Sequence, residues 1–169
     1  SWKKFKFLNN NSIGIEINNP GHNYKYKKFS KKQINSVLKL SKFLIKKYKI
    51  KPTCILGHSD IAPSRKKDPG EKFPWKYLSE NKIGYWHNLN QDIILKKRNI
   101  NLEKKEKLKF VHNLYKIGYS KNYKLSDRKH LKFITIAFQR RFRQQLVNGI
   151  IDLECLLISN NILKKIKFS

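Results

Sequence analysis

Residues 57–70, with the sequence GHSDIAPSRKKDPG, combine one histidine, two aspartates and three cationic side chains. The preceding residues, 53–56, are β-branched or apolar and predict a short buried strand. Pro63 and the Pro69-Gly70 pair exclude a continuous helix, so residues 57–70 are predicted to form an ordered loop. A scaffold commonly presents reactive side chains on a loop at the end of a strand. We call residues 57–70 the site loop.

Two side chains of the site loop are candidate zinc ligands. His58 offers an imidazole nitrogen and Asp68 a carboxylate oxygen, and a catalytic zinc ion takes three protein ligands and a water. Lys66 would place an ammonium group where negative charge develops beside a metal. Alternatively, His58 and Asp60 cap the turn after the strand through hydrogen bonds to the backbone. The residues alone leave both interpretations open.

Three motifs follow one another along the chain: SIGIEINN at 12–19, GHSDIAPSRKKDPGEKFPW at 57–75 and IGYW at 83–86. Together they resemble the zinc-dependent N-acetylmuramoyl-L-alanine amidases of the type-2 amidase family. Those enzymes cut the amide between the lactyl group of N-acetylmuramic acid and L-alanine in peptidoglycan. The resemblance implies an α/β fold, in which a mixed β-sheet is flanked by helices. It also implies that residues 1–86 are the C-terminal portion of an amidase domain acting on peptidoglycan or its muropeptide fragments.

Residues 12–18 alternate three isoleucines with Gly14 and Glu16, the period of a half-buried strand with Glu16 on the opposite face. An exposed strand carboxylate is the alternative for Glu16, and a solvent histidine is the alternative for His22. The resemblance implies these roles: zinc held by His58 and Asp68, Glu16 as general base and acid, Lys66 as oxyanion stabiliser, and His22 and Arg65 as substrate contacts.

The chain departs from the family pattern in one respect. Family members carry a further zinc histidine on an early strand, upstream of the stretch corresponding to Ser1. His22, His87, His112 and His130 do not lie in a matching context, so weak zinc binding and an unpaired sheet edge are expected. The chain has no methionine, so we expect a processed, trimmed or incomplete N-terminus. Either the natural protein extends upstream, or this is a non-catalytic, peptidoglycan-binding remnant of an amidase.

Helices are predicted for the rest of the chain. Ser30 and Gln33 form a capping-box pattern for a helix reaching Tyr48. Residues 73–78 suggest a short helix, residues 87–102 a linker with some helical character, and residues 103–117, 127–143 and 152–163 three further helices. Asn148-Gly149 is a turn signal between the last two helices. Residues 133–152 resemble the small three-helix peptidoglycan-binding domain, with Asn148 where aspartate is usual, so residues 103–169 are predicted to be that domain. A generic helical bundle is the alternative.

Lysine and arginine number 39 against 11 acidic residues, a formal net charge of +28. Such an excess predicts an anionic partner: nucleic acid, anionic lipid or an acidic wall polymer. Most of the cations are lysines, in a composition also rich in Asn, Ile, Tyr and Phe, so we interpret the charge mainly as compositional. Nucleic-acid binding is disfavoured, because the lysines are dispersed and no zinc-finger spacing or RNP-like motif occurs.

Two cysteines in apolar contexts, Cys54 and Cys155, are predicted to be buried free thiols. No apolar run approaches the length of a membrane span, and no signal peptide is visible at Ser1. The wall-binding resemblance favours the bacterial cell envelope, the periplasm, with the cytoplasm as alternative.

Overall fold

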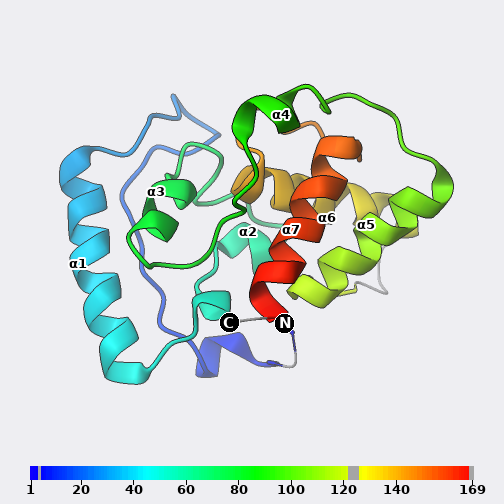
Figure 1. The fold of residues 1–169 in the computed structure, drawn as a ribbon. Helices are drawn as coiled ribbons and strands as arrows, with labels where there is room; N and C mark the ends of the chain where they lie inside the picture. Colours follow the sequence, from blue (N-terminus) through cyan, green and yellow to red (C-terminus); the bar gives the residue numbers. More distant parts are fainter. Residues whose placement is uncertain (4, 122–125, 168–169) are drawn as a thin grey trace.

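The structure is a computed structural model and describes residues 1–3, 5–121 and 126–167. Of the predicted C-terminal domain, residues 122–125 and 168–169 therefore lie outside the described residues. Its α-helices are α1 (Lys31–Tyr48), α2 (His58–Ile61), α3 (Trp75–Glu80), α4 (Gln91–Leu95), α5 (Lys104–Ile117), α6 (Asp127–Phe142) and α7 (Leu153–Lys167). Figure 1 shows α1 at one side of the molecule and α5, α6 and α7 grouped at the other, with α3 and α2 between them.

Helix α1 confirms the predicted capping box. The Gln33 amide donates to Ser30 Oγ at 3.2 Å, and the Ser30 amide donates to Gln33 Oε1 at 2.9 Å. These two bonds satisfy amides that have no partner inside the helix. The apolar side of α1 packs inward through Ile34, Val37 and Leu38, all buried. The first helix therefore begins where the sequence predicts and buries the predicted stripe.

The predicted mixed β-sheet is wrong for this structure. Within the described residues there is no β-strand, and the only ladder pairings are two isolated bridges, Trp2 with Phe5 and Asn101 with Asp152. Residues 12–18, predicted to be a half-buried strand, form neither a strand nor a helix, and no neighbouring strand pairs with them. Inter-strand hydrogen bonds define a sheet, so an alternating pattern without a partner gives none. Ile13 and Ile15 are consequently 51% and 39% exposed.

The second predicted strand, residues 53–56, is also absent. Pro52–Cys54 form a 3₁₀ turn instead. The Cys54 amide donates to the Lys51 carbonyl at 2.8 Å, and the Ile55 amide donates to the Pro52 carbonyl at 3.3 Å. Proline presets the backbone torsion of a tight turn, and local hydrogen bonds replace those of a ladder. The apolar run still leads directly into the site loop.

The three predicted C-terminal helices are present as α5, α6 and α7. The predicted short helix is present as α3, which begins at Trp75, two residues later than predicted. The Phe110 and Phe138 rings meet edge to face with centroids 5.2 Å apart, joining α5 to α6. Ile158 on α7 is fully buried in the same core. Between α6 and α7 the predicted Asn148-Gly149 turn is confirmed, with Gly149 at a φ of 75°, a conformation that favours glycine.

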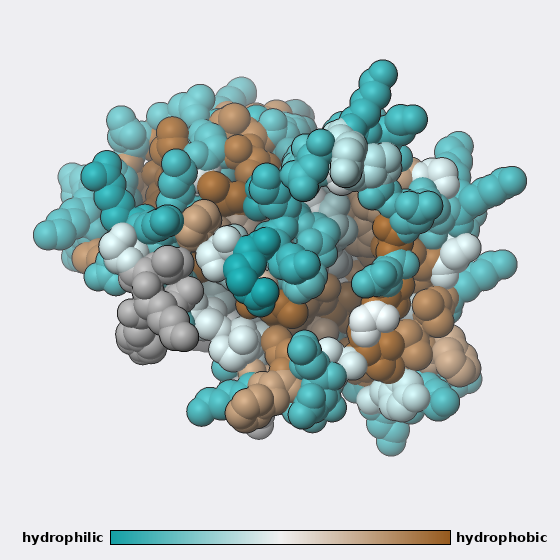
Figure 2. Space-filling model, turned by 180° about the vertical axis from the view of Figure 1, so that it is seen from behind, coloured by the Kyte–Doolittle hydropathy of each residue, from teal (hydrophilic) through white to brown (hydrophobic). Residues whose placement is uncertain are grey.

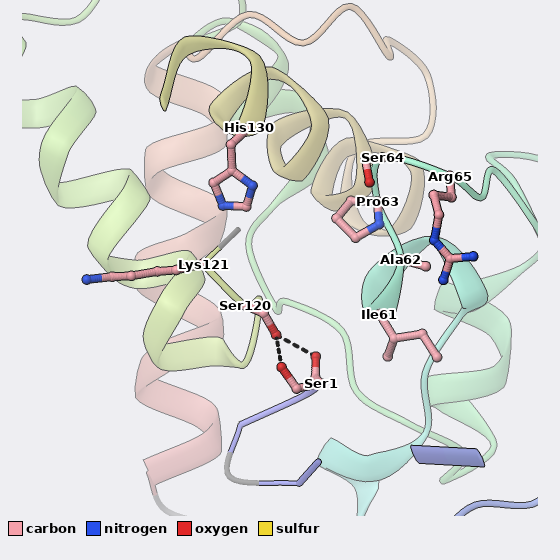
Figure 3. Close-up of a pocket in the computed structure, with 9 residues that line it drawn as sticks. All are labelled: Ser1, Ile61, Ala62, Pro63, Ser64, Arg65, Ser120, Lys121 and His130. Carbon is pink, nitrogen blue, oxygen red and sulfur yellow. Dashed lines mark hydrogen bonds between the residues drawn. The ribbon is translucent and has the colours of Figure 1, made fainter. Parts of the chain in front are cut away.

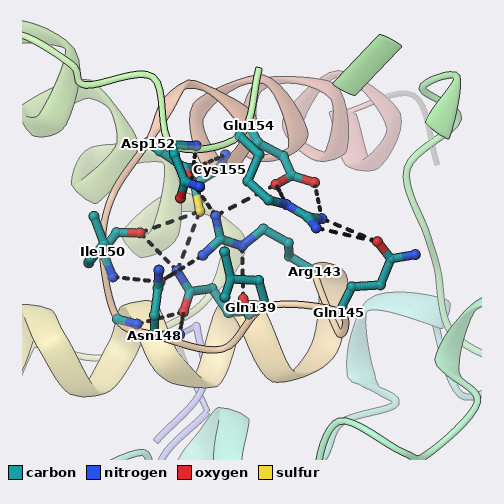
Figure 4. Close-up of polar contacts among 12 residues, drawn as sticks. Gln139, Arg143, Gln145, Asn148, Ile150, Asp152, Glu154 and Cys155 are labelled. Atoms are coloured by element: carbon teal, nitrogen blue, oxygen red, sulfur yellow. Dashed lines mark hydrogen bonds and ion pairs between the residues drawn. The ribbon is translucent and has the colours of Figure 1, made fainter. Parts of the chain in front are cut away.

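Buried polar side chains hold that turn in place (Figure 4). Gln139 Oε1 accepts from the Asn148 and Gly149 amides at 3.0 and 2.8 Å. Arg143, 3% exposed, pairs with Asp152 beneath the turn. A buried arginine is stable only when its charge is paired and its donors are used, so this network ties the end of α6 to the start of α7.

One continuous core connects the two predicted domains. It includes Trp2 and Trp75 from the first part and Phe138 and Ile162 from the second. The predicted linker, residues 87–102, contains α4 and contributes Ile94, which is 2% exposed. The two predicted domains and the linker therefore pack against one another in a shared core. The domain boundaries at residues 86 and 102 remain predictions.

The surface is predominantly polar. Figure 2 shows hydrophilic side chains projecting over most of one face, with apolar patches visible between them. Among the helices of the described residues, none is long and apolar enough to cross a membrane.

Candidate functional site

The structure brings the two predicted zinc ligands together. His58 opens α2, and the site loop returns so that the Ser59 amide donates to the Asp68 carbonyl at 2.9 Å. His58 Nδ1 then lies 3.1 Å from Asp68 Oδ2. Their side chains are 42% and 60% exposed, so the pair faces solvent and is accessible to a ligand.

The geometry of this pair fits zinc in donor type and spacing. With zinc–ligand bonds of about 2.0–2.1 Å and tetrahedral angles, two ligand atoms lie roughly 3.3 Å apart. The two atoms form a hydrogen bond in the structure, and their 3.1 Å separation is close to the spacing of two zinc ligands. However, the described residues contain no group of three His, Cys, Asp or Glu side chains able to hold a metal. His58 and Asp68 therefore fit as two ligands, and a third is not among the residues described.

The capping interpretation is correct for Asp60. Its Oδ2 accepts the Gly57 amide hydrogen at 2.8 Å, the bond expected of a side chain that caps the start of α2. Asp60 is only 2% exposed. His58 differs, because its polar contact is with Asp68. The capping interpretation therefore applies to Asp60, and the zinc-ligand interpretation of His58 stays a prediction.

Glu16 and Lys66 are not brought into contact with the pair. Glu16 is exposed on residues 12–18, and Lys66 is exposed within the site loop. In the part of the chain that the structure describes, neither side chain forms a hydrogen bond or an ion pair with His58 or Asp68. Both residues remain candidates by position only.

His22 belongs to a polar cluster beside the end of the site loop. Its Nε2 lies 3.0 Å from Glu71 Oε2, and its ring lies 4.4 Å from that of Tyr26. The Tyr26 hydroxyl donates to the Pro69 carbonyl at 2.7 Å. Burial raises the pKa of Glu71, but His22 and the charge of Arg140 outweigh it and hold that pKa below 4.5. The Glu71 carboxylate is therefore a stable anchor for His22.

Arg65 lies on another side of the loop, away from this cluster. It lines a hollow of about 230 Å³ together with Pro63, Ser120 and His130. Figure 3 shows these residues arranged around the hollow, with Ser1 and Ser120 joined by hydrogen bonds at one end. The two predicted substrate contacts, His22 and Arg65, are thus separate in the structure.

Two buried residues that contact the site loop were not predicted from the sequence. Arg141 and Tyr119 both bond to Asp60, at 2.6 and 2.8 Å. They lie 81 and 59 residues away from it in sequence. The one sequence signal was Arg141, the second arginine of the stretch AFQRRF. It lies in an apolar stripe of a helix, and a buried arginine requires a partner for its charge.

The comparisons with known proteins concern both halves of the chain. Residues 2–71 match the family described as N-acetylmuramoyl-L-alanine amidase. The amidase AmiD of Escherichia coli K12 is 32% identical over 170 residues, covering 98% of this chain and 61% of the relative. The 1,6-anhydro-N-acetylmuramyl-L-alanine amidase AmpD of Haemophilus influenzae is 40% identical over 76 residues, covering 44% of this chain and 39% of AmpD.

Solved structures agree with the sequence matches. A complex of E. coli AmiD with the substrate anhydro-N-acetylmuramic acid-L-Ala-D-gamma-Glu-L-Lys superposes with a TM-score of 0.85, at 32% identity, covering 97% of this chain and 65% of AmiD. AmpDh3 of Pseudomonas aeruginosa superposes with a TM-score of 0.81, at 29% identity, over 97% of this chain and 66% of that one.

The chain thus spans about three fifths of the length of AmiD in sequence. Both its site loop and its C-terminal helices fall within that similarity, because nearly the whole chain is aligned. Residues 2–71 thus resemble the N-acetylmuramoyl-L-alanine amidase family, and nearly the whole chain is similar to AmiD.

Proposed function

We propose that the natural protein is a zinc-dependent N-acetylmuramoyl-L-alanine amidase that hydrolyses the bond between N-acetylmuramic acid and L-alanine. The observation that carries this proposal is the His58–Asp68 pair, whose 3.1 Å separation suits two ligands of one zinc ion. Both residues lie inside the segment that matches the family. The complex of AmiD with a muropeptide supports a peptidoglycan fragment as the substrate class.

Zinc would polarise the scissile carbonyl and lower the pKa of a bound water. In the proposed assignment, the Glu16 carboxylate accepts a proton from the attacking water and returns it to the leaving alanine nitrogen. The Lys66 ammonium offsets the negative charge that develops on the carbonyl oxygen. Both side chains are exposed.

A second hollow, of about 410 Å³, lies beside the end of the site loop and offers space for the peptide. Lys28 and Lys72 contribute cations to its rim, and Phe29 and Pro74 contribute apolar surface. A peptide stem carrying carboxylates would meet opposite charge at these two lysines, although the Glu71 carboxylate also lines the hollow, and exposed lysines add only modest affinity. We propose this hollow, with His22 nearby, as the place where the peptide end of the substrate lies.

We propose that helices α5 to α7 bind peptidoglycan and thereby keep the enzyme at its polymeric substrate. Support comes from the alignment with AmiD and AmpDh3, which extends over nearly the entire chain. Because the substrate would derive from the cell wall, we propose that the enzyme acts in the bacterial cell envelope.

A zinc titration followed by NMR at the His58 ring tests the proposed site. We expect a saturable shift of the His58 resonances as zinc is added in excess, lost in Asp68→Ala. His22→Ala is the matched control and should retain the shift, because His22 pairs with Glu71 and not with the loop pair. Zinc binding without any change at His58 would contradict the assignment. Binding to insoluble wall with no zinc response would instead favour a wall-binding protein without catalysis.

A further inference from the structure

The C-terminal end of α6 reaches across the molecule to the site loop. Arg141 Nη1 donates to Asp60 Oδ2 at 2.6 Å, and Arg141 Nη2 donates to the Ile55 carbonyl at 2.8 Å. One guanidinium group therefore bonds both to the backbone just before the loop and to a side chain within it. The Arg141 and Asp60 side chains are each only 1% exposed. This ion pair is shielded from solvent, where a charge without its partner is costly.

Neighbouring groups fix the orientation of Arg141. The centre of its guanidinium lies 4.3 Å from the Trp75 ring centroid and 4.9 Å from that of Tyr85. Such cation–π contacts are strongest away from water. The Tyr119 hydroxyl donates to the other Asp60 oxygen at 2.8 Å. Burial, reinforced by the charge of Asp60, raises the pKa of Tyr119 well above 10, so its hydroxyl remains a donor.

Trp75 connects this arrangement to the ligand pair. A Cβ atom placed on Gly57 would lie 2.9 Å from Pro69 Cδ and 3.2 Å from the Trp75 ring. The loop backbone at Gly57, next to His58, is therefore closely packed between Pro69 and the Trp75 ring. Arg141 stacks on that same ring. Asp60 and Trp75 therefore both link Arg141 to the loop backbone at Gly57, next to His58.

Two residues close to Arg141 in the sequence contact the residues that follow the site loop. Arg140 Nε lies 3.8 Å from Glu71 Oε2, directly after the site loop. Gln144 Nε2 donates to the Phe73 carbonyl at 2.6 Å. The end of α6 thus contacts residues 55–73 before, within and after the loop that carries His58 and Asp68.

We propose that Arg141 is a positioning residue of the candidate active site, and that the end of α6 fixes the conformation in which His58 and Asp68 meet. The C-terminal helices then serve the site directly, in addition to any contact they make with the wall. The inference rests on the proposed function for its chemical meaning, but the ordering of the loop is measurable without turnover.

The test compares hydrogen–deuterium exchange in Arg141→Met and Arg143→Met. Arg143 is the matched control, since it is an equally buried arginine on the same helix end, paired with Asp152 and not with the loop. Lost hydrogen bonds to a charged group should speed exchange in residues 57–68 by about tenfold or more in Arg141→Met. In Arg143→Met, the faster exchange should lie in residues 148–155, with the site loop unchanged.

Arg141→Met leaves Asp60 buried without its partner, and the variant could fail to fold. The double variant Asp60→Asn with Arg141→Met removes both charges while still lacking the α6 contact, and it should show the same fast exchange in the loop. Arg141→Lys should restore protection in part, because a single ammonium cannot bond to Asp60 and the Ile55 carbonyl as a guanidinium does. Loop exchange that rises no more in the folded Arg141 variants than in Arg143→Met would overturn the inference.

Zinc affinity separates this inference from the proposed function. If the wild-type chain binds zinc at His58, the Arg141 variants should bind it about 10–100-fold more weakly, the usual effect of losing a group that orients a ligand. Arg143→Met should keep the wild-type affinity. If the wild-type chain binds no zinc, the proposed metal site fails, and the exchange comparison still decides whether Arg141 positions the loop.

Discussion

Glu16→Gln is expected to lower turnover of a muramoyl-L-alanine peptide by about 10²–10⁴-fold, the usual contribution of a general base and acid. The substitution keeps the size of the side chain and removes its ability to accept a proton from water. Because Glu16 is exposed and has no ion-pair partner among the described residues, its loss should leave the free energy of unfolding nearly unchanged. Substrate binding should also change little, so the effect should appear in kcat.

Glu80→Gln is the matched control for this experiment. Glu80 is also an exposed glutamate, but it lies at the end of α3. Its replacement should leave kcat at the wild-type value. If Glu16→Gln retained full turnover, the assignment of Glu16 as the proton-transferring group would be wrong, even if the substrate were cleaved.

The free energy of unfolding should fall by about 3 kcal/mol more in the wild type than in His87→Gln as the pH drops from 7 to 4. His87 is 6% exposed and stacks on Trp86 with ring centroids 5.1 Å apart. Burial, opposed by a backbone hydrogen bond at Phe142 and aided by the charges of Lys76 and Lys165, lowers the pKa of His87 from 6.5 to about 4.

The sign of this effect follows from proton binding. Between about pH 6.5 and pH 4 the unfolded chain binds a proton at His87 that the folded chain does not, so acidification favours unfolding. Glutamine lacks this titration. Urea unfolding at a series of pH values measures the difference, and His112→Gln, which replaces an exposed histidine, is the control. Parallel pH profiles for the wild type and His87→Gln would show that His87 is not buried in its neutral form.

The sequence predicted helices well because their signals are local. The Ser30–Gln33 capping box and the glycine turn at Gly149 each depend on residues within a few positions, and both are present. His58 and Asp68 were predicted to lie together as candidate zinc ligands, and the loop between them does return on itself, while their role as ligands stays a prediction.

The sheet was not predictable, because a strand requires a partner that its own residues do not specify. The isoleucines of residues 12–18 have the right period, yet Ile13 and Ile15 remain exposed without a neighbouring strand. Arg141 was missed for a related reason. Its position in an apolar helix stripe indicates burial, but only the folded chain brings it to Asp60, 81 residues away.

The most direct test of the proposed amidase activity is product analysis by mass spectrometry after incubation of the protein with zinc and an anhydromuramoyl-L-alanine peptide. We expect two products, a muramic acid with a free lactyl carboxylate and a peptide beginning with the free amine of L-alanine. Cleavage at any other bond, or intact substrate beside a protein whose His58 and Asp68 are shown to hold zinc, would contradict it.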